Sequence, residues 1–239
     1  MKEILERILK QLPSFLPDLG KLLTGPKRAI VPWVEEAKGD LARPLVFVGV
    51  AIGIGFVLQL PLLGKEHDFM GTAASMALFK LVALLAFATI IHLLFRVVGG
   101  RAPFSSTFAA FLYLASPLYM ALLLLDIASQ GVVRAFDPTL VATARIDPLY
   151  FVSHPERARE FAAAAPGLAL TYTLLTNAKL IVMVGWFIAC WGAFRQLHGV
   201  KRWRSSVAGV ASALAYALYT QALVFVLLGM FGVLVPPLM

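Results

Sequence analysis

The sequence predicts an all-α polytopic membrane protein with five transmembrane helices. Of its 239 residues, 60% are hydrophobic and 14% charged, and the mean hydropathy is +0.83. Soluble proteins are about half apolar and a quarter charged. A helix needs about 20 apolar residues to cross the hydrocarbon core, and it pairs every backbone amide, which lipid requires. Five runs are long enough: roughly 44–63, 73–95, 107–127, 168–194 and 207–235.

Positive charges are distributed unevenly among the segments that flank these runs. The segments 1–43, 64–72, 96–106, 128–165, 195–205 and 235–239 hold eight, one, two, four, four and no Lys or Arg, respectively. Alternate segments therefore carry 14 on the side of the N-terminus and 5 on the other. By the positive-inside rule, the N-terminus is cytoplasmic and the C-terminus external.

Residues 1–43 precede the five-helix domain (44–239) and form a predicted cytoplasmic amphipathic interfacial segment. Within 1–24, leucines and isoleucines recur at the spacing of one helical face, with charged residues opposite. Such a helix lies along a membrane surface, and we expect Pro13 and Pro17 to break it into short pieces. The stretch AIVPWVEEAKGD repeats the pattern, with Trp33 suited to the interface. MKEILERILK is too charged for a cleaved signal peptide.

The longest connection, 128–165, is predicted to form an external cap. Its Asp-Pro and His-Pro pairs are turn or helix-start signals. PERAREFAAAA is typical of a short helix with Pro155 in its first turn. Its acids and four arginines suit a solvated, ion-paired surface.

An internal repeat links two hairpins about 100 residues apart. Lys80 precedes Phe95-Arg96 as Lys179 precedes Phe194-Arg195, with the same spacing of fifteen residues from Lys to Phe. In each copy a glycine (Gly100, Gly199) and a Ser-Ser pair follow, and LASPLY (114–119) matches LAYALY (214–219) after one inserted residue. This predicts that helices 2–3 and 4–5 form a parallel repeat about an axis along the membrane normal.

Basic side chains of the repeat are the candidate binding residues. Lys80 and Lys179 either snorkel to the outer interface or face each other and bind an anionic headgroup. The GVKRWR loop either fixes topology or contacts anionic lipid or an acidic partner. The candidate contacts are Lys80, Lys179, Arg96, Arg101, Arg195, Lys201, Arg202 and Arg204.

No catalytic, cofactor or metal residues are predicted. Gly99-Gly100-Arg101 lacks the Lys of a phosphate-binding Walker loop. The four histidines are far apart in the chain, Cys190 has no companion cysteine, and the Ser pairs are expected to cap helices. Asp126 could pair with Arg134. We therefore expect a protein that is not an enzyme.

Two stretches resemble the Yip domain family of Ypt/Rab-interacting membrane proteins. They are IHLLFRVVGGRAPFSSTFAAFLYLASPLYM (91–120) and WFIACWGAFRQLHGVKRWRSSVAGVASALAY (186–216), and the resemblance covers roughly 25–228. It implies five helices, a cytoplasmic N-terminus and an external C-terminus. Eukaryotic relatives act in vesicle trafficking and bind Rab-type GTPases, and they carry an Asp-Leu-Tyr-Gly-Pro signature. Here only LLTGP (22–26) echoes it, so a small GTPase partner is doubtful.

The function expected is that of a non-enzymatic Yip-type protein that organises membrane or recruits partner proteins. Its partners would be the bilayer with its anionic lipids, a second copy of the chain or other membrane proteins, and no nucleic acid. The Ala/Arg-rich sequence points to a bacterial inner (cytoplasmic) membrane. The alternative is a small transporter, channel or lipid-handling protein with a site between the hairpins. That alternative requires a polar cavity at mid-membrane, lined by residues such as Thr173, Thr176, Asn177 or Gln221.

Overall fold

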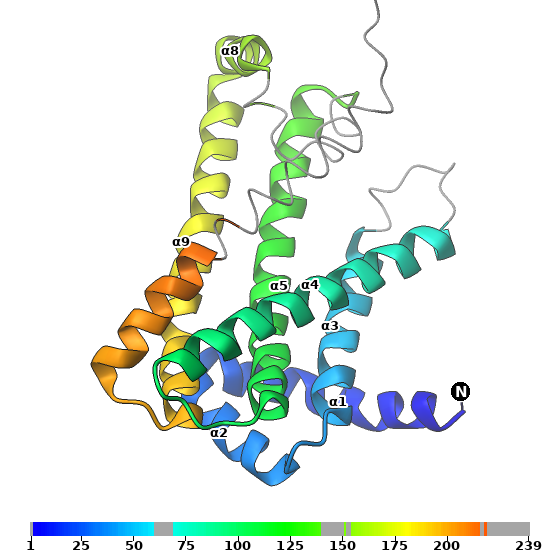
Figure 1. Cartoon of the computed structure of the whole chain (residues 1–239). Coiled ribbons are helices and arrows are strands. Elements are labelled where there is room, and N and C mark those ends of the chain that lie inside the picture. The colour runs from blue at the N-terminus through cyan, green and yellow to red at the C-terminus, as the bar shows by residue number, and fades with distance from the viewer. Residues whose placement is uncertain (1, 60–68, 140–150, 152–153, 216–217, 219–239) are drawn as a thin grey trace, which may run out of the picture.

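The computed structural model describes residues 2–59, 69–139, 151, 154–215 and 218. These residues form helices and the turns between them, with no strand among them (Figure 1). Three helices are long and apolar enough to cross a membrane: α3 (Ala42–Gln59), α5 (Phe104–Phe136) and α9 (Pro166–His198). A fourth, α4 (Phe69–Val97), contributes the apolar stretch Leu81–Val97. The prediction of a helical membrane protein is confirmed.

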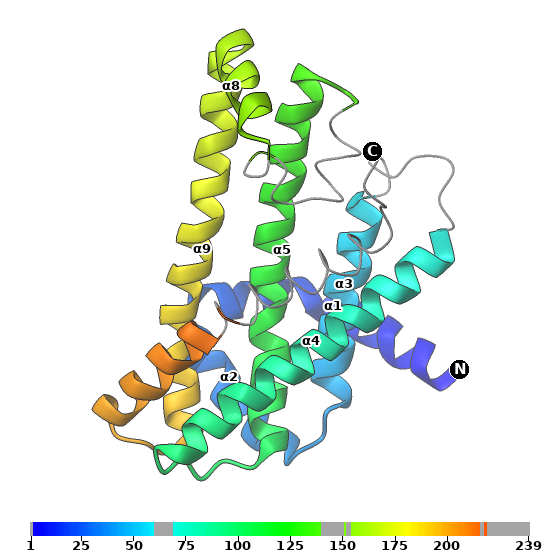
Figure 2. The ribbon, with the colours of Figure 1, turned by 45° about the horizontal axis from the view of Figure 1, so that its top comes forward.

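The long helix α5 lies at the centre of the bundle. It packs against α9, α3 and α4, and α5 and α9 run side by side in both views, while α4 crosses α5 obliquely (Figures 1 and 2). Small side chains on α5 allow these approaches, because an alanine or serine keeps two helix backbones close. The buried residues at this crossing include Ala109, Ala110, Tyr113, Leu114, Phe47, Ala51, Ala193 and Phe194.

The fifth predicted run is described only in part. Residues 202–215 are helical and leave the end of α9 through a short turn (Figure 1). A Cβ atom added at Gly209 would lie 3.3 Å from the ring of Trp191, so this helix packs on α9 at that glycine. Residues 216–217 and 219–239 lie outside the described residues.

Two amphipathic helices lie across one end of the bundle. They are α1 (Lys2–Thr24) and α2 (Pro26–Ala37), and we call this the basic end, where the turns after α4 and α9 also lie. The expectation that Pro13 and Pro17 break α1 is wrong, because α1 is one continuous helix. Each proline removes only one backbone donor, and the buried face with Phe15 and Leu22 continues past both.

An ion pair fixes α1 to the first membrane helix. The Asp18 side chain is 8% exposed, and its two carboxylate oxygens accept bonds from Arg43 Nη2 at 3.0 Å and Lys21 Nζ at 3.3 Å. The Arg43 guanidinium also lies 5.3 Å from the centre of the Trp33 ring, a cation–π distance. Trp33 in turn packs on Tyr113 of α5. One buried carboxylate thus joins α1 and α3, and Arg43 extends the contact to α2.

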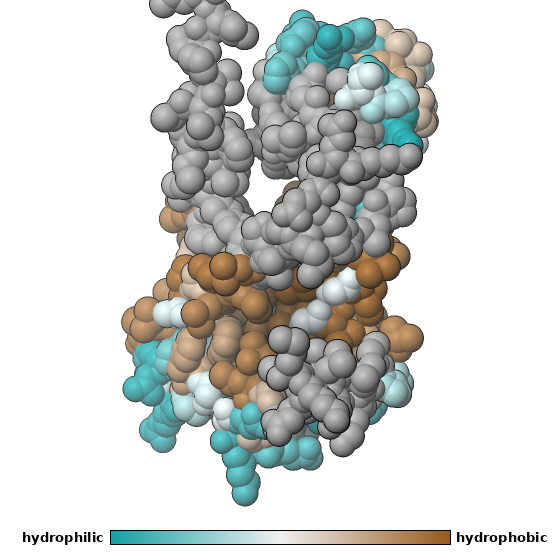
Figure 3. Space-filling view, turned by 90° about the vertical axis from the view of Figure 1, so that its right-hand side faces the viewer, coloured by the Kyte–Doolittle hydropathy of each residue, from teal (hydrophilic) through white to brown (hydrophobic). Residues whose placement is uncertain are grey.

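The opposite end carries α8 (Pro155–Ala164), with Pro155 at its first position, which confirms this predicted helix. Phe161 is buried against Phe136 and Tyr172. Arg157 Nη1 donates to Glu160 Oε2 at 2.9 Å on the exposed side. On the face that Figure 3 shows, hydrophobic side chains form a band next to the charged basic end, as expected for helices in a bilayer.

The Asp18 ion pair leads to a prediction about α1. In Asp18→Asn, loss of the carboxylate charge should weaken the attachment of α1 by about 1–2 kcal/mol, since Arg43 is partly exposed to solvent. Trypsin cleavage after Lys21, in the last turn of α1, should then be roughly 5- to 30-fold faster in detergent. Glu35→Gln, on the exposed side of α2, is the control and should cleave at the wild-type rate. Equal rates for both variants would mean that the ion pair does not hold α1.

Candidate functional site

The turns that follow α4 and α9 have the same backbone design. Each contains a glycine in the left-handed region, Gly99 at φ +95° and Gly199 at φ +63°. One residue later, the amide of Gly100 donates to Phe95 O at 2.7 Å, and that of Val200 donates to Arg195 O at 3.3 Å. This is the bond pattern that closes a helix with a C-terminal glycine. The sequence comparison aligned Gly100 with Gly199. In the structure the counterpart of Gly199 is Gly99, because Gly99 has the left-handed conformation.

The two turns lie against each other at the basic end. The Arg101 amide donates to His198 O at 3.1 Å, which joins the backbones of segments about 100 residues apart. Phe95 stacks on the His198 ring at 4.8 Å between centroids and lies 6.1 Å from Phe194. The repeated Phe-Arg pairs thus end two helices that meet each other.

A threonine hydroxyl connects three helices just above these turns. Thr107 Oγ1 of α5 lies 3.0 Å from His92 Nδ1 of α4 and 3.0 Å from His198 Nε2 of α9. One hydroxyl can donate to one ring nitrogen and accept from the other. Thr107 is fully buried and His198 is 1% exposed. Among the described groups, His198 Nδ1 has no hydrogen-bond partner.

The sequence analysis missed this histidine pair because the histidines are far apart in the chain. The available signal was their distance from the repeated Phe-Arg pairs: His92 precedes Phe95 by three residues and His198 follows Phe194 by four. His198 is therefore the last residue of α9 and His92 lies five residues before the end of α4, and the repeat places those ends at the same level.

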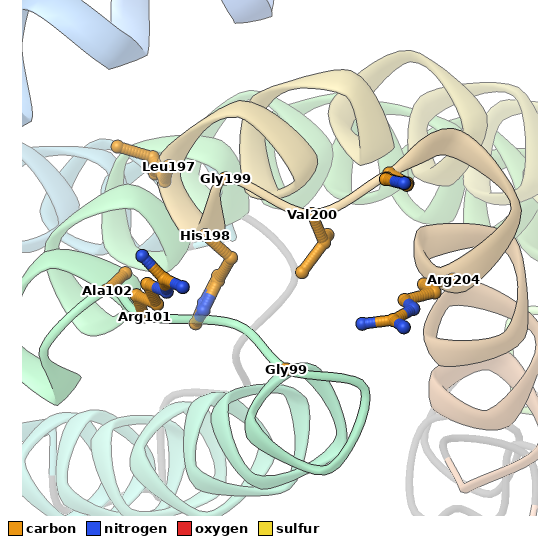
Figure 4. A pocket seen from close by; sticks show the side chains of 9 residues that line it. Gly99, Arg101, Ala102, Leu197, His198, Gly199, Val200 and Arg204 are labelled. Atoms are coloured by element: carbon orange, nitrogen blue, oxygen red, sulfur yellow. The ribbon is translucent and has the colours of Figure 1, made fainter.

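A hollow of about 500 Å³ opens between the two turns. Figure 4 shows Arg101 beside His198 on one side and Arg204 on the other, with the Arg204 guanidinium directed toward the space between them. Lys201 is the third basic residue in the lining. Among the described residues that line the hollow, none is acidic. A Cβ atom at Gly99 would lie 3.3 Å from Arg204 Nη1, so Arg204, at the start of the helix 202–215, reaches the first turn.

The structure brings together three of the eight candidate contact residues: Arg101, Lys201 and Arg204. Arg96 Nη1 donates weakly to Gly100 O at 3.5 Å and holds the first turn. Arg195 and Arg202 are near the second turn but outside the lining of the hollow. The side chain of Lys80 lies outside the described residues.

Lys179 is far from this group. Its Nζ lies 2.5 Å from Asp126 Oδ1, so an ion pair joins α9 to α5. Asp126 therefore pairs with Lys179 and not with Arg134, the partner suggested from the sequence. A paired lysine in a membrane helix is far less costly than an isolated one. The hypothesis that Lys179 and Lys80 bind one headgroup together stays a prediction.

The serine pairs do not cap helices as the sequence suggested. The first residue of α5 follows Pro103, and no side chain caps it. Ser205 Oγ and Ser206 Oγ donate to Arg202 O at 2.8 and 3.1 Å, within the first turn of the helix 202–215. A serine hydroxyl can accept from a backbone amide and cap a helix, or it can donate to a carbonyl of its own helix. Both serines here donate to a carbonyl.

The polar residues of α9 that were proposed to line a transport cavity form hydrogen bonds to backbone carbonyls of α9 itself. Thr173 and Thr176 donate to the carbonyls of Ala169 and Tyr172 at 2.9 Å, and Asn177 Nδ2 donates to Thr173 O at 3.0 Å. All three side chains are on the exposed part of α9, and Gln221 lies outside the described residues. In the part of the chain that the structure describes, no group of His, Cys, Asp or Glu could hold a metal ion.

Comparison of the chain with models of protein families, with curated proteins and with solved structures gave no match.

The contact between Gly100 and His198 can be tested by adding one methyl group. In Gly100→Ala the new Cβ would lie 2.6 Å from His198 Nδ1 and 2.6 Å from Phe95 O. The backbone or the ring must shift, which costs about 1–3 kcal/mol, so the thermal unfolding temperature in detergent should fall. Gly49→Ala is the control, because a Cβ there meets nothing within 4 Å. If both variants unfold at the same temperature, the two turns do not pack as described.

The Thr107 hydroxyl gives a second prediction for the same measurement. Thr107→Val keeps the shape but leaves two ring nitrogens without their shared partner, and an unsatisfied buried polar group costs about 1–3 kcal/mol. Unfolding should therefore occur at a lower temperature in Thr107→Val, while Thr107→Ser, which keeps the hydroxyl, should recover most of the loss. A valine variant as stable as wild type would show that the hydroxyl bridge contributes nothing.

Proposed function

We propose that this protein is a non-enzymatic integral membrane protein of the Yip type that organises membrane or recruits partner proteins through its basic end. The observation that carries the proposal is the gathering of α1, α2 and both glycine turns at one end of the bundle. That end exposes basic side chains, including Arg101, Lys201 and Arg204. A surface of this kind suits anionic lipid or an acidic protein surface.

In the proposed topology the basic end faces the cytoplasm. Five helices cross the membrane, the N-terminus is cytoplasmic and the C-terminus external, and helices 2–3 and 4–5 are a parallel repeat. The supporting observation is the charge asymmetry of 14 against 5. The shared glycine-turn geometry at Gly99 and Gly199 supports the repeat. The proposed location is a bacterial cytoplasmic membrane.

The interior of the described bundle favours this function over transport. Where α5 meets α3 and α9, the buried side chains are mainly alanine and aromatic residues, and the suggested cavity residues of α9 bond their own backbone. A transport pathway needs polar groups that face a shared space. A packed apolar centre suits a protein that acts through its surfaces.

Site-specific photo-crosslinking in native membranes tests the proposed function. A photoreactive side chain in place of Trp203, which is exposed at the basic end, should capture one or a few proteins reproducibly. The same group in place of Glu156, on α8 at the opposite end, is the matched control and should not capture them. The same products from both positions, or no protein from Trp203, would contradict a role in recruiting partners.

A further inference from the structure

We infer that the hollow between the two glycine turns is a binding site for a phosphate group. The inference deepens the proposed function. It rests on the proposed topology in one respect: if the ligand is a lipid, the topology decides which leaflet supplies it. Phosphate esters occur both in anionic phospholipid headgroups and in small soluble metabolites, and the site chemistry is the same for both.

The charges in the hollow favour an anion with several oxygens. Arg101 comes from the first turn, Lys201 from the second, and Arg204 from the first turn of the helix 202–215 that follows it. None of the three forms an ion pair with a described acidic residue. Three basic groups around one space repel one another, and a bound anion relieves that repulsion. Guanidinium groups also match the oxygens of a phosphate geometrically, each with two parallel N–H donors.

The position of the hollow favours a group at the membrane surface. It lies at the end of α9, beyond the apolar span, and between that helix and the end of α4. Basic pockets between transmembrane helices are a known way of holding lipid headgroups. A volume of about 500 Å³ is large enough for a phosphate with the glycerol or small alcohol that it esterifies.

The walls of the hollow are held in place before any ligand binds. The Arg101 amide is bonded to His198 O, and the His198 ring is stacked on Phe95 and bonded to Thr107. Gly99 and Gly199 contribute backbone without side chains, so neither turn fills the space. A pre-formed site loses less entropy on binding than one that must order itself.

His198 is the feature that distinguishes this hollow from an ordinary basic surface. Its ring lines the hollow and is 1% exposed, yet Nδ1 has no partner among the described groups. Nδ1 lies against Gly100, where an added Cβ would be 2.6 Å from it, so the ring braces the first turn from inside the hollow. The basic side chains would then hold the charge, and His198 would form the floor.

Binding can be measured by native mass spectrometry of the full chain in maltoside detergent, whose headgroup carries no phosphate. One arm adds phosphatidic acid or phosphatidylglycerol to the micelles, and a second adds soluble glycerol 3-phosphate or inorganic phosphate. One tightly retained phosphate compound is expected. Retention in the first arm alone identifies a lipid ligand, and retention in the second arm identifies a soluble one. No retention in either arm would overturn the inference.

Charge-matched variants separate this site from general surface attraction. Arg101→Gln with Arg204→Gln removes one guanidinium from each turn and should weaken binding at least about tenfold. Arg28→Gln with Lys38→Gln removes the same charge from exposed positions on or next to α2 at the same end and should change binding less than about twofold. Equal losses in the two double variants would overturn the inference. The crosslinking result at Trp203 is independent of this one, so the two proposals can fail separately.

Discussion

The close approach of α5 to α9 is the constraint on which the rest of the bundle depends. Within a bilayer, water does not drive helices together, so their association depends on close packing and on hydrogen bonds between helices. Ala109 and Ala110 of α5 and Ala193 of α9 are buried at 0–2% exposure. Trp186 Nε1 adds a hydrogen bond of 2.8 Å to Leu114 O of α5. Pro117 lies about one turn further along α5 and has no backbone N–H, so α5 lacks one of its own hydrogen bonds in this region. The hydrogen bond from the Trp186 indole stabilises α5 there.

The basic end follows from this packing. The start of α5 and the end of α9 lie at the same level, so the turn before α5 contacts the turn after α9. At this level Thr107 reaches both histidines. The Asp126–Lys179 pair ties the same two helices toward the opposite end. Polar contacts near both ends and an apolar crossing between them keep two long helices from sliding past each other.

Sequence alone predicted the elements better than the contacts between them. The length of an apolar run and the residues that form a turn are local properties of the sequence. The main helices and the helix that begins at Pro155 could therefore be predicted from the sequence alone. The continuity of α1 through Pro13 and Pro17 could not, because it depends on a buried face that only the packed bundle provides. Of the candidate site, Arg101, Lys201 and Arg204 were found because they belong to the two basic loops of the repeat, GGR and GVKRWR. His198 was not, because its role comes from contacts with Thr107 and Phe95, which are far away in the chain.

The bond between the Arg101 amide and His198 O also has a meaning during biosynthesis. The first turn emerges from the ribosome about 100 residues before the second, which at roughly 5–20 residues per second is a delay of about 5–20 s. Throughout that interval the acceptor that His198 O provides for the Arg101 amide has not yet been made, and the second wall of the hollow is missing. Completion of the pair requires that α9 has been inserted and that the chain has turned at Gly199. The assembled pair of turns therefore marks a chain in which α9 has reached its place beside α5.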